Sequence, residues 1–175
     1  MSAITIISGT NRPGSNTLKV AELCKKMLKD QGLEAELFSL ENVPPTMAFS
    51  ELFGKRSPEF EAIISKYVEN SSKFLFITPE YNGSYPGILK TFLEAIHPRF
   101  FNFKKAGLIG VSDGRAGNLR GIEQLTLVLH YLKMTVFYNK LPVSQVTKHI
   151  NPEGQVITDE TRIVLENYLK DFVEF

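Results

Sequence analysis

Short apolar runs alternate with amphipathic stretches of helical period along the whole chain. This alternation is typical of βαβ units, in which successive strands lie parallel in one sheet. Strands are predicted at residues 3–8, 33–39, 73–78, 106–112 and 135–139. Helices are predicted at about residues 16–31, 57–71, 86–97, 119–133 and 158–173. The pattern therefore predicts an α/β fold built around a five-stranded parallel sheet.

The second predicted strand differs from its neighbours in polarity. Residues 33–37 read Leu-Glu-Ala-Glu-Leu, whereas the runs 4–7, 74–77 and 108–111 are mostly apolar. Alternation indicates a strand with one solvated face, and continuous apolarity indicates a strand covered on both faces. The second strand is therefore expected at an edge, as in the flavodoxin-like order 2-1-3-4-5, a three-layer sandwich with its switch point between strands one and three. Residues 142–158 fit neither period, although Asn-Pro-Glu-Gly at 151–154 is typical of a turn, consistent with a hairpin after strand five.

Length and composition narrow the class of protein further. The 175 residues, 43% of them hydrophobic, suit one domain, which we expect over residues 1–175. The net charge is +1, from 20 basic and 19 acidic side chains, and no stretch collects like charges, so neither nucleic acid nor a membrane surface is an expected partner. A single cysteine, Cys24, forms no intrachain disulfide, and neither an apolar leader nor an apolar span of ~18 residues is visible. We therefore expect a cytoplasmic protein whose ligands are small molecules or protein.

The turn after the first predicted strand combines groups that hold a phosphate. Residues 8–17 read Ser-Gly-Thr-Asn-Arg-Pro-Gly-Ser-Asn-Thr, contain no acidic residue and open the first helix. A helix N-terminus offers unpaired N–H donors and a partial positive charge, and the planar guanidinium of Arg12 can donate two hydrogen bonds. The alternative is a capped helix with a solvent-exposed arginine, but a cap needs only one of these side chains. The run therefore favours a dianion site.

Two further loops are expected beside this turn. In an open parallel sheet, ligands bind beyond the carboxyl ends of the strands at the switch point, where the loops after strands one, three and four meet. Residues 79–87 contain two tyrosines, two prolines and two glycines, which give rigid backbone and flat rings. Residues 112–117 contain two glycines, so their backbone can approach a planar group from its other side. Together the loops predict a site for a phosphate at one end and a flat ring system at the other.

Three motifs, taken in order, resemble those of the NADPH-dependent FMN reductase family, flavodoxin-like proteins that include quinone, azo-dye and chromate reductases. A Gly-Ser/Thr-x-Arg-x-x-Ser turn is matched by residues 9–15, and Pro-Glu-Tyr-Asn-x-x-x-Pro-Gly-x-Leu-Lys is matched at every defined position of residues 79–90. A Gly-Arg-x-Gly-Gly-x-Arg-like stretch is matched by residues 114–120, except that Asn118 stands where the second glycine is usual. Residues 97–101 depart from the Asp-Trp pair of many relatives, which bears on the subunit contact.

The resemblance implies FMN as the cofactor, NADPH as the reductant, and a role for each loop. The residues implied to hold the FMN phosphate are Thr10, Arg12, Ser15, Asn16 and Thr17. Those implied to lie along the isoalloxazine are Pro79, Glu80, Tyr81, Asn82 and Gly83, and those implied to approach it from the fourth strand are Ser112, Asp113 and Gly114. For Tyr81 and Asn82 the alternative is a well-made turn with a buried tyrosine. For Glu80 the alternatives are a cap on a neighbouring loop and a contact between subunits.

Other reactive side chains have simpler interpretations. Arg115 and Arg120 fit either the 2′-phosphate of NADPH or ordinary salt bridges at an interface. The three histidines, His97, His130 and His149, share no metal-ligand spacing, and no metal site is predicted. Cys24 is expected to be a small helix residue without chemistry.

The fourth predicted helix is apolar around more than one face. Within residues 119–133 most positions are hydrophobic, and Phe92, Phe100, Phe101 and Phe103 crowd the region before the fourth predicted strand. A helix that is hydrophobic all round is normally buried, and one face of a sheet cannot cover it completely. We therefore expect a homodimer built on the third and fourth helices; a homo-oligomer, dimer or tetramer, is also what the resemblance implies.

The activity implied by the resemblance is that of an NAD(P)H oxidoreductase. NADPH would deliver hydride to FMN N5, and a quinone, azo, metal-oxyanion or free-flavin acceptor would then take the electrons. No catalytic side chain is predicted, because the flavin carries the chemistry. One alternative is a flavodoxin-like electron carrier without NADPH turnover, although such carriers are typically strongly acidic and this chain is nearly neutral. Another is a flavin-binding module without turnover.

Overall fold

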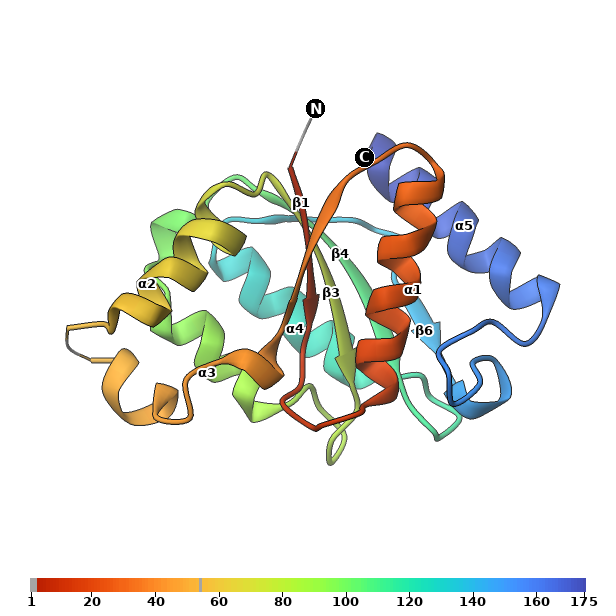
Figure 1. The fold of residues 1–175 in the computed structure, drawn as a ribbon, viewed down its shortest axis with the longest axis horizontal. Helices are drawn as coiled ribbons and strands as arrows, with labels where there is room; N and C mark the ends of the chain where they lie inside the picture. The colour runs from red at the N-terminus through yellow and green to blue at the C-terminus, as the bar shows by residue number, and fades with distance from the viewer. Residues whose placement is uncertain (1–2, 54) are drawn as a thin grey trace.

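A twisted parallel sheet runs through the centre of the molecule, with helices on both of its faces (Figure 1). The computed structural model describes residues 3–53 and 55–175. The strands are β1 (Ile4–Ser8), β2 (Ala35–Ser39), β3 (Lys73–Pro79), β4 (Lys105–Val111), β5 (Thr135–Val136) and β6 (Leu141–Val143). The α-helices are α1 (Asn16–Asp30), α2 (Pro58–Ile64), α3 (Gly87–Ala95), α4 (Leu119–Tyr131) and α5 (Asp159–Glu174). Shorter helical turns are η1 (Leu40–Asn42), η2 (Met47–Glu51), η3 (Ser65–Glu69), η4 (Pro98–Phe100) and η5 (Val146–Lys148).

The strand order confirms the predicted topology. It is β2-β1-β3-β4-β5, and each of these neighbouring pairs is parallel. Strand β2 lies at the edge, as its alternating sequence predicts, with Ala35 buried and the adjacent Glu36 exposed. Strand β2 lies on one side of β1, and β3, β4 and β5 follow on its other side. The switch point therefore lies at the carboxyl ends of these two strands.

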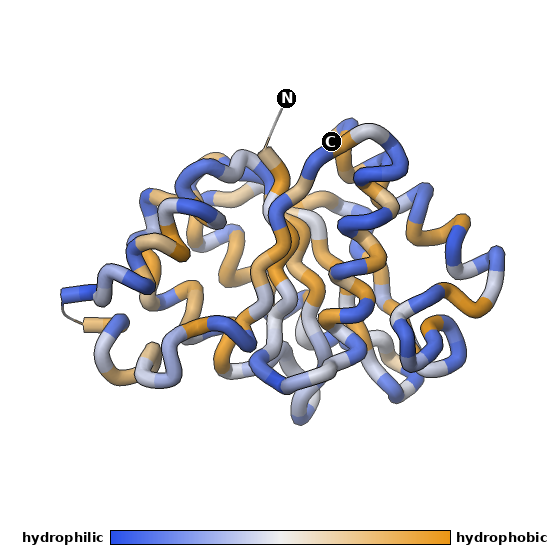
Figure 2. The backbone as a smooth tube through the Cα atoms, in the orientation of Figure 1, coloured by the Kyte–Doolittle hydropathy of each residue, from blue (hydrophilic) through white to orange (hydrophobic). Residues whose placement is uncertain are grey.

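Two hydrophobic cores lie on opposite faces of the sheet. Along β3, Phe74 and Phe76 belong to the core shared with α2, α3 and α4, whereas Leu75 and Ile77 belong to the core shared with α1 and α5. Both faces of this strand are covered, which is why its sequence is a continuous apolar run. In Figure 2 the central strands are largely orange, while hydrophilic positions recur along the surrounding helices. The three-layer sandwich is thus confirmed.

The prediction of one fifth strand over residues 135–139 is wrong in its extent. Strand β5 ends at Val136, although the N–H of Phe137 still donates to the carbonyl of Ala106 at 2.7 Å. The chain then leaves the sheet, with Tyr138 exposed, and returns as β6, which pairs in parallel with Ile109–Val111 of β4. Strand β6 has an open side, so it tolerates Pro142, which cannot donate to a ladder. The predicted turn at 151–154 is confirmed, flanked by an antiparallel bridge between Ile150 and Val156.

The second predicted helix is shorter than expected as an α-helix. Helix α2 ends at Ile64, and the chain continues through Ser65–Glu69 with the wider hydrogen-bond spacing of a π-turn. The hydrophobic pattern did not predict this change, because a shift of one residue in hydrogen-bond spacing barely alters which side chains face the core. The structure also adds η1 and η2, in a stretch for which the sequence pattern predicted no element.

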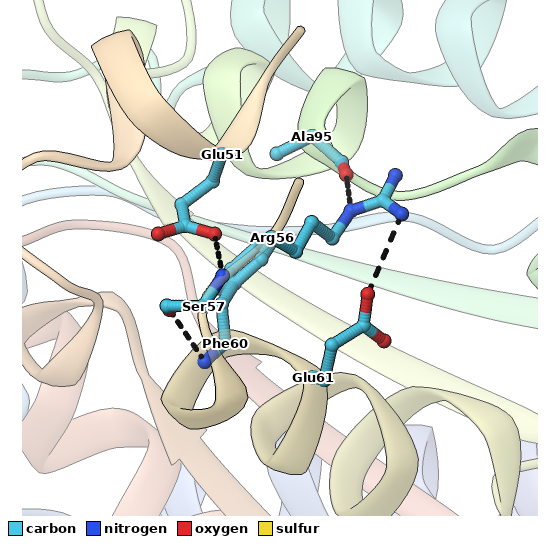
Figure 3. A network of polar contacts seen from close by, with 6 residues as sticks. All are labelled: Glu51, Arg56, Ser57, Phe60, Glu61 and Ala95. Carbon is cyan, nitrogen blue, oxygen red and sulfur yellow. Dashed lines mark hydrogen bonds and ion pairs between the residues drawn. The ribbon is translucent and has the colours of Figure 1, made fainter. Parts of the chain in front are cut away.

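A polar network fixes the segment that leads into α2 (Figure 3). The carboxylate of Glu51, only 2% exposed, accepts a hydrogen bond from the N–H of Ser57 at 2.8 Å. The Ser57 hydroxyl oxygen caps α2 by accepting from the N–H of Phe60. Arg56 donates through Nε to the carbonyl of Ala95 at 2.8 Å and lies 3.6 Å from Glu61. The segment is therefore tied to the end of α3.

The predicted single domain over residues 1–175 stays a prediction, and it includes Met1, Ser2 and Gly54, which lie outside the described residues. Within the described residues, no helix combines the length and apolar character needed to cross a membrane.

Candidate functional site

A cavity of about 410 Å³ lies at the carboxyl edge of the sheet. The loops after β1, β3 and β4 meet at this edge (Figure 1). These are the three loops that the sequence pattern brings together at the switch point. The residues lining the cavity are Arg12, Pro13, Gly14, Ser15, Asn16, Thr17, Pro79, Glu80, Tyr81, Val111, Ser112, Asp113 and Val146. Segments about 100 residues apart in the chain thus enclose one space.

The turn after β1 forms one wall of the cavity and ends at the start of α1. Ser15 is the N-cap, and its Oγ accepts a hydrogen bond from the N–H of Leu18 at 3.1 Å. This bond uses a lone pair of the hydroxyl and leaves its proton free to donate. The N–H groups of Asn16 and Thr17 lie in the first turn, where a helix provides no acceptor of its own. The first turn carries no acidic residue, so the helix itself places no negative charge at its positive end.

Thr10 joins this turn to the loop after β3. Its Oγ1 accepts from the N–H of Arg12 at 3.2 Å and lies 2.9 Å from the hydroxyl of Tyr81. Thr10 is 1% exposed and is absent from the cavity lining, whereas the exposed Arg12 lies on the cavity. Thr10 therefore orders the turn, while Arg12 and the helix terminus face the space that a ligand would fill.

The loop after β3 is a tight hairpin that presents Pro79, Glu80 and Tyr81 to the cavity. Tyr81 and Ser84 exchange two backbone hydrogen bonds, of 2.9 and 3.1 Å. Between them Asn82 and Gly83 have φ values of 52° and 79°, the two positive values that a type I′ turn requires. Asn82 and Gly83 thus form the tip of the hairpin, and neither belongs to the cavity lining. Burial raises the pKa of the nearby Tyr85, so its phenol stays neutral.

The loop after β4 is braced from within and from behind. The Ser112 hydroxyl donates to the carbonyl of Gly114 at 2.9 Å and accepts from the N–H of Gly117 at 3.0 Å. Behind this loop, the N–H of Gln145 donates to the carbonyl of Gly114, and the N–H of Val146 donates to the carbonyl of Ser112. Ser112 and Asp113 line the cavity, whereas Gly114 does not.

Four lining residues were not among the predicted site residues: Pro13, Gly14, Val111 and Val146. Pro13 and Gly14 lie within the turn that was predicted to hold a phosphate. Val111 ends the apolar run of β4 directly before Ser112, so its place at the strand end was a usable signal. Val146 comes from the stretch whose pattern fits no period, and nothing in the sequence places it at the site. Arg115 and Arg120 are exposed and lie outside the cavity lining, so both interpretations of their role stay open.

The remaining candidate groups lie elsewhere. Burial raises the pKa of the Cys24 thiol to about 12, so this side chain stays a neutral thiol in the interior of α1. Across residues 3–53 and 55–175, no three His, Cys, Asp or Glu side chains are grouped as a metal ion would require. The walls of the cavity thus combine anion-binding donors from the turn after β1 with a tyrosine and loop backbone from the loops after β3 and β4.

Comparison with known proteins gives consistent results. The family model described as NADPH-dependent FMN reductase matches residues 2–148. An FMN-dependent NADPH-azoreductase of Staphylococcus aureus is 34% identical over 116 residues, which are 62% of this chain and 60% of that protein. The chain therefore aligns with less than two thirds of the length of this relative.

Solved structures share the fold at low sequence identity. The flavoenzyme FerB, an NAD(P)H:(acceptor) oxidoreductase from Paracoccus denitrificans, superposes with a TM-score of 0.78 at 23% identity, covering 99% of this chain and 96% of that one. An NADH:FMN oxidoreductase in its apo form gives 0.81 at 20% identity, covering 98% and 88%. A flavodoxin from Pseudomonas aeruginosa gives 0.61 at 19% identity, covering 98% and 97%. These likenesses confirm the flavodoxin-like fold.

Proposed function

Because the chain belongs to the NADPH-dependent FMN reductase family, we propose that it is a flavoenzyme that passes electrons from NAD(P)H through bound FMN to a small-molecule acceptor. The observation that carries this proposal is the meeting of three loops around one cavity of about 410 Å³. Quinones, azo compounds, metal oxyanions and free flavins are the acceptor classes proposed. The azoreductase relative supports the azo class.

The chemistry of the cavity walls suits FMN, which carries a phosphate dianion at one end and a planar ring at the other. At the α1 terminus, the hydroxyl protons of Ser15 and Thr17, first-turn N–H groups and the Arg12 guanidinium are the donors that a dianion requires. We propose that Thr10 and Asn16 complete this phosphate site, Thr10 by ordering the turn.

At the other end of the cavity, loop backbone and Tyr81 are suited to a flat ring. We propose that Pro79, Glu80, Tyr81, Asn82 and Gly83 lie along one side of the isoalloxazine, and that Ser112, Asp113 and Gly114 lie along the other. Bound FMN would supply hydride acceptance and electron donation, which no amino-acid side chain performs. The side chains would bind and orient the ring and exclude water, so we assign none of them as acid, base or nucleophile.

We also propose a homo-oligomer whose subunits meet through α3 and α4. On α4, Leu127 is 70% exposed and Tyr131 is 85% exposed, although both continue the apolar pattern of the helix. They border a mostly apolar groove of about 490 Å³ shared with Leu93 and Ile96 of the α3 region. A second copy would remove these side chains from water, which is favourable in proportion to the apolar area buried. Both a dimer and a tetramer fit this proposal. A cytoplasmic location stays a prediction.

The proposed cofactor is tested by binding alone. Protein stripped of flavin is titrated with FMN, riboflavin and FAD, and flavin fluorescence is followed. We expect FMN to bind more tightly than riboflavin, because only FMN fills the anion site. Equal affinity for FMN and riboflavin would overturn the phosphate assignment, and no affinity for any flavin would overturn the proposed function. The rival electron carrier would bind FMN equally well but would not be reduced by NADPH.

A further inference from the structure

Asn118 makes contacts that its place in the chain does not require. It is fully buried, has φ 63° and ψ 30°, and occupies the N-cap position of α4. An asparagine at this position usually accepts a hydrogen bond from an N–H of the first turn, but Asn118 makes no such cap. Its Nδ2 instead donates to the carbonyls of Thr78 at 3.0 Å and Pro79 at 2.9 Å, the last two residues of β3.

The orientation of this amide is fixed by its neighbours. Two carbonyl oxygens face one end of it, so that end must be the nitrogen. The oxygen, Oδ1, has no hydrogen-bond partner among the described residues. A Cβ added to Gly121 would lie 2.1 Å from this oxygen and 2.6 Å from the backbone nitrogen of Tyr85, so Gly121 keeps both atoms close to α4. Asn118 is therefore packed between the β3 end and the return arm of the hairpin. Buried polar atoms without partners are uncommon in native proteins, so this one marks a constrained site.

One of the two hydrogen bonds donated by Asn118 acts on the peptide group that begins the hairpin. The carbonyl of Pro79 is held by Asn118, and the N–H of Glu80 donates to the carbonyl of Val111 at 3.0 Å. Both polar atoms of the Pro79–Glu80 peptide are thereby engaged, which fixes its plane. Two residues further on, Tyr81 is held by Thr10. Glu80 lies between these two fixed points, on the wall of the cavity.

We infer that Asn118 is a positioning residue that sets the orientation of residues 79–81 toward the flavin ring; this inference rests on the proposed function. It acts through backbone and does not line the cavity. Its loss should therefore weaken the binding of the ring and leave the phosphate end unchanged. The ratio of the dissociation constants for FMN and riboflavin should then stay constant while both rise.

Two substitutions separate this role from a general effect on folding. Asn118→Gly keeps the positive φ, which glycine adopts without strain, and removes the amide. Asn118→Asp keeps the size of the side chain but places carboxylate oxygens against two carbonyls. The control is Lys133→Gly, an exposed residue with φ 58° at the other end of α4. It introduces the same backbone freedom without touching a loop of the site.

The experiment measures FMN and riboflavin affinity, the visible absorption spectrum of the bound flavin and the melting temperature of the flavin-free protein. We expect Asn118→Gly to weaken the binding of both FMN and riboflavin by about tenfold, because two buried hydrogen bonds are lost. The absorption spectrum of the bound flavin should also shift. We expect Asn118→Asp to bind both flavins more weakly still. Lys133→Gly should match the original protein in flavin affinity and spectrum. If either folded Asn118 variant equals Lys133→Gly in affinity and spectrum, the inference is wrong.

Two further outcomes are decisive. If FMN affinity falls but riboflavin affinity does not, Asn118 acts on the phosphate end and the inference is also wrong. If the unsubstituted protein binds no flavin, the proposed function fails first. Should neither variant fold, the side-chain amide resonances of Asn118 in the unsubstituted protein decide. They should be protected from exchange and shift when FMN is added, and unprotected or unshifted resonances would contradict the inference.

Discussion

The hydroxyl of Tyr81 lies 2.9 Å from Oγ1 of Thr10, so the hairpin after β3 is joined to the turn after β1 across 71 residues of sequence. The same threonine oxygen accepts the N–H of Arg12. One side chain thus connects the proposed phosphate site with the proposed ring site.

Tyr81→Phe should weaken FMN binding by about fivefold, because the variant keeps the ring and loses one hydrogen bond between the loops. Riboflavin should be affected to a similar degree, since the hairpin faces the ring. Fluorescence titration measures both. Tyr138→Phe, which removes the hydroxyl of a tyrosine that is 83% exposed, is the control. Unchanged affinity in Tyr81→Phe would mean that the connection does not order the site.

Arg12→Ala should weaken FMN binding by about 10- to 100-fold and leave riboflavin binding unchanged, because the guanidinium acts on the phosphate through charge-assisted hydrogen bonds. The loss should be smaller at high salt, which screens the exposed arginine. The matched control is Arg162→Ala, which removes another exposed arginine, on α5. An equal loss for FMN and riboflavin would contradict the phosphate role.

These two loops show how far the sequence alone leads. The strand order followed from the alternating residues of β2, and it obliged the loops after β1, β3 and β4 to share one edge of the sheet. The composition of each loop then indicated what each could bind. The role of Asn118 was not predictable, because its hydrogen-bond partners lie about 40 residues away and depend on a positive φ. Val146 was missed for a related reason: the β6 to η5 segment is held by loop contacts, not by a periodic apolar face.

Leu127→Glu should convert the proposed oligomer into monomers, because it places a charge in the middle of the exposed apolar face of α4. Sedimentation velocity at working concentration measures the change. Ile163→Glu makes the same substitution at a 54% exposed position on α5 and should leave the assembly intact. If the unsubstituted protein already sediments as a monomer, the α3 and α4 interface does not exist.

Stability should fall at alkaline pH partly through Cys24. Burial raises the pKa of this thiol from 9.0 to about 12, so above pH 9 the unfolded chain loses a proton that the folded chain keeps. The folded state then binds more protons, and the free energy of unfolding decreases as pH rises through this window. Cys24→Ala removes the effect. The stability advantage of the original protein over Cys24→Ala should therefore shrink by about 1.4 kcal/mol between pH 8 and pH 10.

Urea unfolding of both proteins at the two pH values measures this difference. Other buried groups, including Tyr168, whose pKa burial also raises, contribute to both proteins and cancel to first order in the comparison. An advantage that is the same at pH 8 and pH 10 would show that the thiol ionises as readily in the folded state as in the unfolded chain.

The central claim is that the chain passes electrons from a nicotinamide through bound FMN, and anaerobic rapid mixing tests it most directly. FMN-loaded protein is mixed with NADPH or NADH, and the visible band of oxidised flavin is followed; a quinone or azo acceptor is then added. The predicted result is rapid loss of the band with at least one nicotinamide and its return on addition of acceptor, with a slower first phase in Asn118→Gly. A fully loaded protein whose flavin band persists with both nicotinamides would contradict the claim and favour an electron carrier or a flavin-binding module.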